Sequence, residues 1–411
     1  MERVVITGMG AVTPIGNDVE ALFTSIKEGN CGIAPITHFD TTDYKVKLAA
    51  EVKDLDMEQY FNKRDLKFND RFTQFARIAA KQAMEMAGLT KDEADSERYG
   101  CLVASGIGGI STIETSEKTM EERGPSRVSP YFIPMALSNL AAGQIAIDWG
   151  LRGTCECVVT ACAAGANAIG EAFRKIRDGY EDVMVTGGAE ASITPLSIAG
   201  FQSMRALHTG TDPERASIPF DAERSGFVMG EGAGILVLES LTHAKARNAT
   251  ILGEIVGYGA SCDAHHITAP LNDGSGGAKA MVNAITDAGI QKEDIAYINA
   301  HGTSTSLNDK AETLAVKAAF GEHAKHLAIS STKSNTGHLL GASGAVEAII
   351  CVKALKEGII PATIHYEKAD PDCDLDIVPN KCRKQNYTYA MSNSLGFGGH
   401  NASLIFKKWE D

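Results

Sequence analysis

The sequence lacks any run of about 18 consecutive apolar residues, so no segment is expected to span or insert into a membrane. Its first residues, MERVVITGMG, begin with a strand-like run and lack the charged, apolar and small-residue order of a secretory signal. Aromatic residues make up only 6% of the chain, whereas 41 of its 411 residues are glycine. We therefore expect a cytoplasmic protein in which backbone layers pack closely.

Basic residues are also fewer than acidic ones. The chain has 39 lysines and arginines and 52 aspartates and glutamates, which gives a net charge of −13. This balance disfavours nucleic acid or an anionic membrane as the main partner. The nine cysteines are an odd number with scattered spacing, which is typical of free thiols in a reducing compartment. Cys155 and Cys157 are separated by one residue, which fits strand alternation better than a zinc site, so no metal is predicted.

An internal duplication organises the chain. Residues 341–358, GASGAVEAIICVKALKEG, align without a gap with residues 162–179, CAAGANAIGEAFRKIRDG. The strand-like runs VVITGMGA and CLVASG precede the first helix and correspond in order to EIVGYGA and YINAHG before the second. We predict two halves, residues 1–250 and 251–411, that pack as one compact body.

Apolar strand-like runs alternate with helical stretches in both halves, which predicts an α/β protein. The runs are continuously apolar, which indicates sheets covered on both faces, and the alanine-rich and glycine-rich helices fit buried positions between sheets. A dinucleotide-binding reading of VVITGMGAVTPIG fails, because Thr13 stands at the third glycine and Pro14 follows it.

Cys162 lies in VVTACAAGANAIG, where a β-branched run changes into a helical pattern. A thiol at a helix start faces unpaired N–H groups, which lower thiol pKa values to about 3.5–7.5 from about 8.5. The sequence thus predicts a nucleophile activated by the helix terminus. The alternative is that a cysteine among alanines is a small core residue.

Two histidines share this kind of setting. His301 follows a strand in INAHGTST, and His338 ends KSNTGH, just before the second helix of the duplication. By the alignment, Ser105 takes the place of His301 in the first half, and Gly341 takes the place of Cys162 in the second. Each half is therefore expected to supply different parts of one site. The loop SNSLGFGGHN has the glycine density that lets a backbone N–H approach a bound oxygen.

With these motifs the chain resembles the β-ketoacyl-[acyl carrier protein] synthases of the thiolase-like condensing enzymes. TACAAGA resembles their nucleophile motif, AHGTST and KSNTGH their histidine motifs, and SNSLGFGGHN their closing glycine loop. The likeness extends over the whole chain. It implies a layered α-β-α-β-α fold with two mixed five-stranded sheets and buried central helices.

The resemblance implies a decarboxylative Claisen condensation that elongates fatty acids. Cys162 would accept an acyl chain from acyl carrier protein, and malonyl-carrier protein would then lose CO₂ and attack that thioester. Neutral His301 and His338 would donate hydrogen bonds to the enolate oxygen, and the N–H groups of Cys162 and Phe397 would form an oxyanion hole. Lys333 would orient the site electrostatically. No cofactor is implied, because the phosphopantetheine arm of the carrier protein brings the substrates.

The resemblance also implies a set of substrate-binding positions and a subtype. Glu347 is expected to hold Lys333 or a water network. Ile107 in SGIGG, with Phe201 and Phe397, favours the type II synthases, which extend medium and long chains. The substrate-binding residues implied are Ile107, Phe201, Thr268, Thr303, Thr305, Glu347 and Gly398.

The implied partners are an acidic acyl carrier protein and a second copy of the chain in a homodimer. An acidic synthase needs a local basic patch to dock an acidic carrier. The alternative is a solvated helix face with no partner. The docking residues predicted are Lys63, Arg64, Lys67, Arg123, Arg127 and Arg205.

Two related functions remain as alternatives. One is a polyketide-type ketosynthase, and the other is a non-condensing partner like a chain-length factor, which the presence of Cys162, His301 and His338 argues against. The sequence departs from common family spellings without removing any proposed catalytic group. The departures are Leu395, His400, Ser306 and Ala269.

Overall fold

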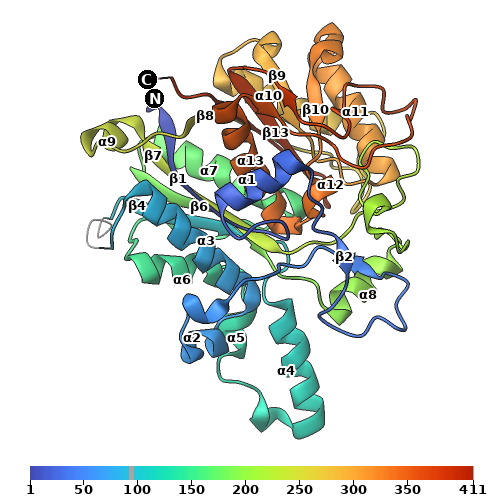
Figure 1. The fold of residues 1–411 in the computed structure, drawn as a ribbon. Coiled ribbons are helices and arrows are strands. Elements are labelled where there is room, and N and C mark those ends of the chain that lie inside the picture. The colour runs from blue at the N-terminus through green and yellow to red at the C-terminus, as the bar shows by residue number, and fades with distance from the viewer. Residues whose placement is uncertain (92–96, 411) are drawn as a thin grey trace.

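The structure is a computed structural model that describes residues 1–91 and 97–410. Its main feature is a ten-stranded mixed sheet, in the order β10-β9-β13-β14-β8-β1-β7-β6-β4-β5 (Figure 1). These strands are β1 (Val4–Val12), β4 (Tyr99–Ala104), β5 (Cys155–Glu156), β6 (Val183–Glu190), β7 (Gly232–Ser240), β8 (Gly253–Cys262), β9 (Ile295–Asn299), β10 (Ala328–Ser330), β13 (Tyr389–Gly396) and β14 (His400–Lys407). Two short strand pairs join β2 (Ala34–Pro35) to β3 (Leu48–Ala49) and β11 (Ile359–Ile360) to β12 (Arg383–Lys384).

The α-helices are distributed through both halves of the chain. They are α1 (Val19–Glu28), α2 (Lys63–Phe68), α3 (Arg71–Ala87), α4 (Ile110–Arg123), α5 (Phe132–Ala136), α6 (Leu140–Trp149), α7 (Ala164–Arg177), α8 (Pro195–Ser203), α9 (Leu241–Ala246), α10 (Ser275–Ala288), α11 (Ser306–Phe320), α12 (Lys333–Thr336) and α13 (Ser343–Glu357).

The sheet repeats its own pairing pattern on the two sides of the β1–β8 contact. Going outward from β1, the pairs β1–β7 and β7–β6 are antiparallel, and β6–β4 and β4–β5 are parallel. Going outward from β8, the pairs β8–β14 and β14–β13 are antiparallel, and β13–β9 and β9–β10 are parallel. The same order of strand directions is expected of a duplicated unit.

The two predicted five-stranded sheets are the two halves of the ten-stranded sheet, joined edge to edge at β1 and β8. Val4, Val5 and Ile6 of β1 pair antiparallel with Ile255, Glu254 and Gly253 of β8. This short ladder satisfies backbone groups that two free sheet edges would leave open. The division at residue 250 remains a prediction, since the strands on its two sides belong to one continuous sheet.

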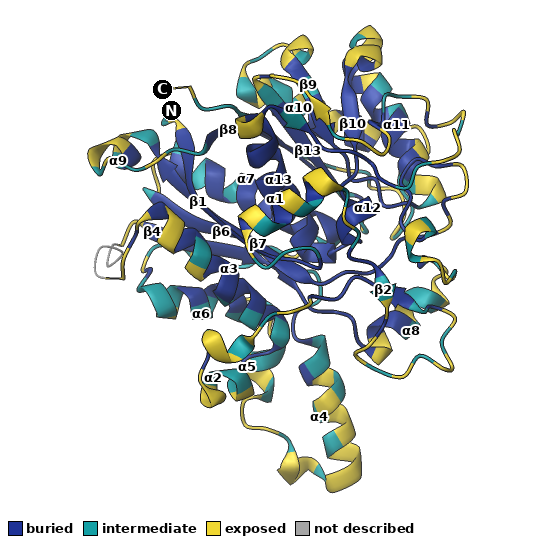
Figure 2. Cartoon of the chain, viewed as in Figure 1, coloured by how far each residue is buried: buried dark blue, intermediate teal, exposed yellow. Residues whose placement is uncertain are grey.

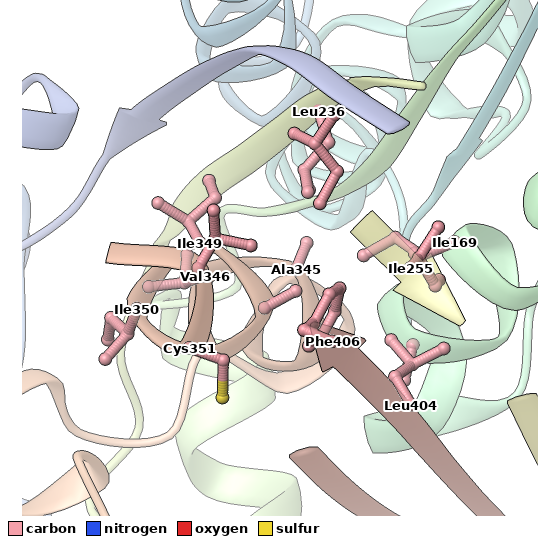
Figure 3. Packing of buried hydrophobic residues seen from close by; sticks show 14 of the residues in the cluster. Ile169, Leu236, Ile255, Ala345, Val346, Ile349, Ile350, Cys351, Leu404 and Phe406 are labelled. Carbon is pink, nitrogen blue, oxygen red and sulfur yellow. The ribbon is translucent and has the colours of Figure 1, made fainter. Parts of the chain in front are cut away.

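Three hydrophobic clusters confirm the layered α-β-α-β-α arrangement. The central cluster gathers residues of α7 and α13 with the facing sides of both half-sheets, and Figure 3 shows Val346, Ile349 and Ile350 beside residues of the neighbouring strands. A second cluster lies under α3 and α6, and a third lies under α10 and α11. Figure 2 shows the central helices buried and the helices at the periphery partly exposed.

Small residues explain why two helices fit between the half-sheets. A side chain at Gly165 of α7 would lie 2.8 Å from the carbonyl oxygen of Gly341, and one at Gly344 of α13 would lie 2.7 Å from the backbone nitrogen of Ala166. The two helices therefore meet backbone to backbone near their N-termini. This contact brings the parts of the chain that precede both helices into one region.

Candidate active site

The candidate nucleophile stands on a strained turn. Cys162 lies in a 3₁₀ turn, Ala161–Ala163, directly before α7. Ala161 has φ 50°, a left-handed conformation that costs a non-glycine residue about 1–3 kcal/mol. The duplicated turn, Leu340–Ala342, precedes α13 and has the same feature at Leu340, with φ 47°. The repeated strain indicates that this turn shape is part of the duplicated scaffold.

One cavity of about 330 Å³ brings the candidate catalytic side chains together. Cys162, His301 and His338 all line it, although they lie in three separate segments of the chain. The predicted binding residues Phe201, Thr268, Thr303 and Thr305 line it as well, as does Phe397.

The two histidines lie ring against ring, with centroids 5.3 Å apart and nearly perpendicular planes. Only 3% of His301 and 2% of His338 is exposed. Burial lowers the pKa of both imidazoles well below the ordinary histidine value, and the charge of Lys333 lowers both further. Both rings are therefore neutral near pH 7, and each has one N–H to donate.

Lys333 is buried outside the cavity lining and acts on this site through its charge. The side chain is 1% exposed and forms an ion pair with Glu347 of α13. Neither residue lines the cavity. Burial raises the pKa of Glu347 to about 7, against the opposing attraction of Lys333. Lys333 thus influences the cavity through its charge. Of the two roles that the resemblance implied for Glu347, holding Lys333 or a water network, the ion pair is the one present.

The thiol differs from its sequence-based expectation. Burial raises the pKa of Cys162 to about 12, although the charge of Lys333 and the N–H groups of Phe397 and Cys162 itself favour the thiolate. Glu190 adds a further upward contribution. The predicted lowering by the helix terminus is therefore wrong for this state of the protein, because desolvation outweighs the N–H groups.

The glycine loop between β13 and β14 is pressed against the nucleophile turn. A side chain at Gly396 would lie 2.8 Å from the carbonyl oxygen of Thr160 and 3.3 Å from the backbone nitrogen of Cys162. Gly398 and Gly399 follow with φ 85° and 75°, which glycine adopts without strain. The N–H of Phe397 and the N–H of Cys162 itself both act on the Cys162 sulfur, and each lowers the pKa of the thiol.

The sequence matches two family models, one for each part of the chain. Residues 1–244 match the beta-ketoacyl synthase N-terminal domain, and residues 252–367 match the C-terminal domain. The chain belongs to the β-ketoacyl synthase family. Its fold, its membership of the condensing enzymes and its classification as an acyltransferase are therefore confirmed.

Among the relatives of this β-ketoacyl synthase are two named 3-oxoacyl-[acyl-carrier-protein] synthase 2. The one from Staphylococcus aureus (strain COL) is 53% identical over 409 residues, covering 100% of this chain and 99% of the relative. The one from Synechocystis sp. is 51% identical over 410 residues, covering 100% and 99%. These names confirm the sequence-based recognition of a type II elongating synthase.

Solved structures of more distant family members share the fold over the whole chain. A β-ketoacyl synthase from Burkholderia phymatum has a TM-score of 0.92 at 35% identity, with both chains fully covered. A type II polyketide ketosynthase, solved with its acyl-carrier protein, has a TM-score of 0.92 at 33% identity, again with full coverage. The polyketide-type structure is less similar in sequence than the fatty-acid relatives, so that alternative is not favoured.

Some predicted binding residues lie outside the cavity lining. Ile107 is half-buried and packs in the hydrophobic cluster that also holds Cys162 and Phe201. Gly398 donates its N–H to the carbonyl oxygen of Ile267 at 2.7 Å, which fixes the glycine loop. The departures Leu395, Ser306 and Ala269 line the cavity.

The predicted docking residues are all exposed but are not gathered at one place on the chain. Arg205 lines the cavity. Lys63, Arg64 and Lys67 belong to α2, whereas Arg123 ends α4, which projects from the body of the molecule (Figure 1). Arg127 lies in the short turn that follows α4. Only Arg205 is therefore at the cavity of the same chain.

Sequence reasoning missed several polar residues that hold the site. Glu312 of α11 accepts hydrogen bonds from the N–H groups of His301 and Gly302, both at 2.8 Å, and Ser343 contacts Nδ1 of His338 at 2.9 Å. Glu190 at the end of β6 was also missed. An acidic residue on a helix face that is rich in alanine and valine, as at Glu312, is the signal that could have found one of them.

The described residues, 1–91 and 97–410, contain no group of three or more histidine, cysteine, aspartate or glutamate side chains placed to hold a metal ion. The absence of a cofactor stays a prediction. In the same residues no helix is long and apolar enough to cross a membrane.

Proposed function

We propose that this β-ketoacyl synthase condenses an acyl thioester with a malonyl group carried on acyl carrier protein, with Cys162 as nucleophile and His301 and His338 as hydrogen-bond donors. The observation that carries the proposal is the opening of all three side chains into one cavity. The relatives at 51–53% identity are named 3-oxoacyl-[acyl-carrier-protein] synthase 2, which fits this reaction.

The first half of the reaction transfers the acyl chain to the enzyme. The Cys162 sulfur forms a bond to the acyl carbonyl carbon, and the bond from that carbon to the phosphopantetheine sulfur breaks. The thiol proton leaves with the departing sulfur, so no net charge is created in the buried site. The carbonyl oxygen becomes negative in the transition state, where the N–H groups of Cys162 and Phe397 stabilise it.

The second half forms the new carbon–carbon bond. The malonyl carboxylate leaves as CO₂, and its electron pair forms an enolate on the remaining two carbons. The enolate carbon attacks the acyl carbonyl, and the Cys162 sulfur departs as a thiolate. The thiolate then takes up one proton from solvent, which restores the thiol. Neutral His301 and His338 stabilise the enolate oxygen through their N–H groups, and each such donor contributes about 2.7–4 kcal/mol.

The remaining lining residues have positioning roles in this proposal. The hydroxyl groups of Thr303 and Thr305 lie 3.0 Å apart at the cavity, where they are suited to polar groups of the pantetheine arm, as is Thr268. Ile107 and Phe201 form the apolar side next to Cys162, where the acyl chain is bound. Gly398 contributes by fixing the loop that carries Phe397.

We propose acyl carrier protein as the protein partner, docked on the predicted basic residues. Arg205 stands at the cavity that the pantetheine arm must enter, which supports docking on that face. A related polyketide ketosynthase was solved in complex with its acyl-carrier protein. A cytoplasmic location is proposed on the nine free cysteines.

We also propose a homodimer through the outer edge of β5. β5 is one of the two terminal strands of the sheet, so its outer backbone groups are open to pairing. Nearby, Ile147 is 65% exposed and Val159 is 56% exposed, which is unusual for large apolar side chains beside a free strand edge. Sedimentation equilibrium of the wild-type protein should give twice the mass of one chain. The mass measured for Ile147→Asp should be lower, closer to that of a single chain.

The proposed reaction is tested by product analysis with octanoyl-carrier protein and malonyl-carrier protein. The wild-type protein should release CO₂ and form a 3-oxodecanoyl product, which is two carbons longer than the acyl donor. His301→Ala and His338→Ala should still acylate Cys162 but lose about 100-fold or more in malonyl decarboxylation. Histidine variants that decarboxylate malonyl-carrier protein at the wild-type rate would contradict the assigned roles.

A further inference from the structure

Glu190 is a fully buried carboxylate that the proposed mechanism leaves without a role. It is the last residue of β6 and accepts hydrogen bonds at both oxygens. Its Oε2 accepts the N–H of Gly106 at 2.7 Å and that of Gly341 at 3.1 Å. Its Oε1 accepts the hydroxyl of Ser192 at 2.9 Å and the N–H of Ile107 at 3.3 Å.

No basic side chain among the described residues forms an ion pair with Glu190, so backbone and hydroxyl donors alone hold it. Two glycines make room for it. A side chain at Gly106 would lie 2.7 Å from its Oε2, and one at Gly341 would lie 2.9 Å from the same atom. A buried carboxylate held by several N–H donors and close glycines is a built feature of the site rather than a chance contact.

The duplication shows what this carboxylate replaces. Gly341 corresponds to Cys162, so its N–H is the counterpart of an N–H that faces the thiol in the other half. At the helix start of the second half, the oxygen that accepts this N–H belongs to Glu190 of the first half. One of the two equivalent helix starts is therefore open to the cavity, and the other is filled by an internal anion.

The groups that Glu190 holds lie directly around the acyl side of the cavity. Ile107 and Leu340, the neighbour of Gly341, pack in the same hydrophobic cluster as Cys162. The turn is braced further by Ser105, whose hydroxyl accepts the N–H of Gly108 at 3.0 Å and contacts Glu190 at 3.3 Å. None of these contacts involves His301 or His338.

We propose that Glu190 is a positioning residue for acyl transfer, because its carboxylate fixes residues 105–108, and with them Ile107, beside Cys162. This inference rests on the proposed function, since it assigns Ile107 to the acyl-binding side. Glu190 also faces the thiol electrostatically, together with Lys333, while His301 and His338 face it as neutral groups. Removing the carboxylate charge should therefore make the thiolate easier to form.

Glu190→Gln tests the proposal because it keeps the shape but turns one oxygen into an NH₂ group. That group must face N–H donors, so either Ile107 loses its acceptor or Gly106 and Gly341 both do. Ser192→Ala removes a single donor and serves as the milder variant. Glu181→Gln is the matched control, because Glu181 is a buried carboxylate just before the other end of β6 and accepts the N–H of Thr154 at 2.7 Å.

The two half-reactions should respond differently. In Glu190→Gln, acylation of Cys162 followed by intact mass should slow about tenfold or more, and more for a C14 than for a C8 acyl-carrier protein. Malonyl decarboxylation should stay within about twofold of wild type, and alkylation of Cys162 by iodoacetamide at pH 8 should be faster. Ser192→Ala should slow acylation by about two- to fivefold, and Glu181→Gln should match wild type.

The proposal is overturned if Glu190→Gln and Ser192→Ala acylate both chain lengths at the wild-type rate. It is equally overturned if both half-reactions fall by the same factor at both chain lengths, which is the result of a general loss of structure. If Glu190→Gln does not fold, Ser192→Ala decides between these results. A wild-type protein that forms no acyl adduct would instead contradict the proposed function.

Discussion

At the scale of single residues, burial determines the charge state of the candidate site. It keeps His301 and His338 neutral, and it keeps the Cys162 thiol protonated despite its position before a helix. Neutral histidines suit an enolate, because an N–H donor stabilises negative charge without giving up its proton. The protonated thiol requires that its proton leave during acyl transfer.

Lys333→Met tests how the buried cation acts on the cavity. Lys333 lowers the pKa of the Cys162 thiol and of both imidazoles, so its removal should raise all three. A rise of one unit in the thiol pKa slows alkylation by iodoacetamide about tenfold at any pH below that pKa. The rate of malonyl decarboxylation falls at low pH as the histidines become protonated. In Lys333→Met this fall should begin at a higher pH, because the histidines then protonate more easily.

The matched control is Lys353→Met. Lys353 is also a buried lysine, but it lies on α13 and pairs with Glu20 and Glu357. It should leave the alkylation rate unchanged between pH 7 and 10. An equal alkylation rate in Lys333→Met and wild type would contradict the proposed electrostatic role.

The sequence alone was sufficient to place Cys162, His301 and His338 in one site, because each lies in its own recognisable motif. It could not predict the raised thiol pKa, which depends on burial by residues distant in the chain such as Ile193 and Met229. Glu190 and Glu312 were missed for the same reason, since their partners become visible only when strand ends and helices meet.

At the scale of elements, the contact between α7 and α13 positions the nucleophile turn. The helix predicted from residue 162 begins at Ala164, and its counterpart begins at Ser343, each after a 3₁₀ turn. The periodicity predicted both helices. The turns were not predicted, because close contacts between the two halves, rather than local propensity, hold Ala161 and Leu340 at positive φ.

Gly165→Ala should therefore destabilise the protein by about 1–3 kcal/mol, because its methyl group would lie 2.8 Å from the carbonyl oxygen of Gly341. Urea unfolding with unchanged slope measures this difference. Gly143→Ala in α6 is the control, since its methyl group meets only Leu140 Cδ1 at 3.7 Å and a helical alanine gains about 1 kcal/mol over glycine. Equal stability of the two variants would contradict tight helix packing.

At the scale of the whole molecule, a net charge of −13 must be reconciled with an acidic carrier protein. The two-half fold predicted from the sequence accounts for the meeting of the cavity residues. The sequence did not predict that the half-sheets join, or that the basic residues of α2 and α4 lie apart from Arg205. These features depend on how surface elements project from the body, which periodicity does not report.

Reversing Lys63, Arg64 and Lys67 to glutamate tests docking on α2. The KM for acyl-carrier protein should rise about tenfold while kcat is retained, because the variant weakens electrostatic association and leaves the cavity intact. The charge-matched control reverses Lys325, Lys381 and Lys384 on the surface of the second half, and it should change KM little. A KM equal to wild type in the α2 variant would contradict this docking site.

The central claim is that Cys162 carries the acyl chain, and intact mass spectrometry tests it most directly. After incubation with C8 to C16 acyl-carrier proteins, the wild-type chain should gain the mass of one acyl group. Cys162→Ala should gain none, although eight other cysteines remain. The same adduct in Cys162→Ala, or none in the wild-type protein, would contradict the account.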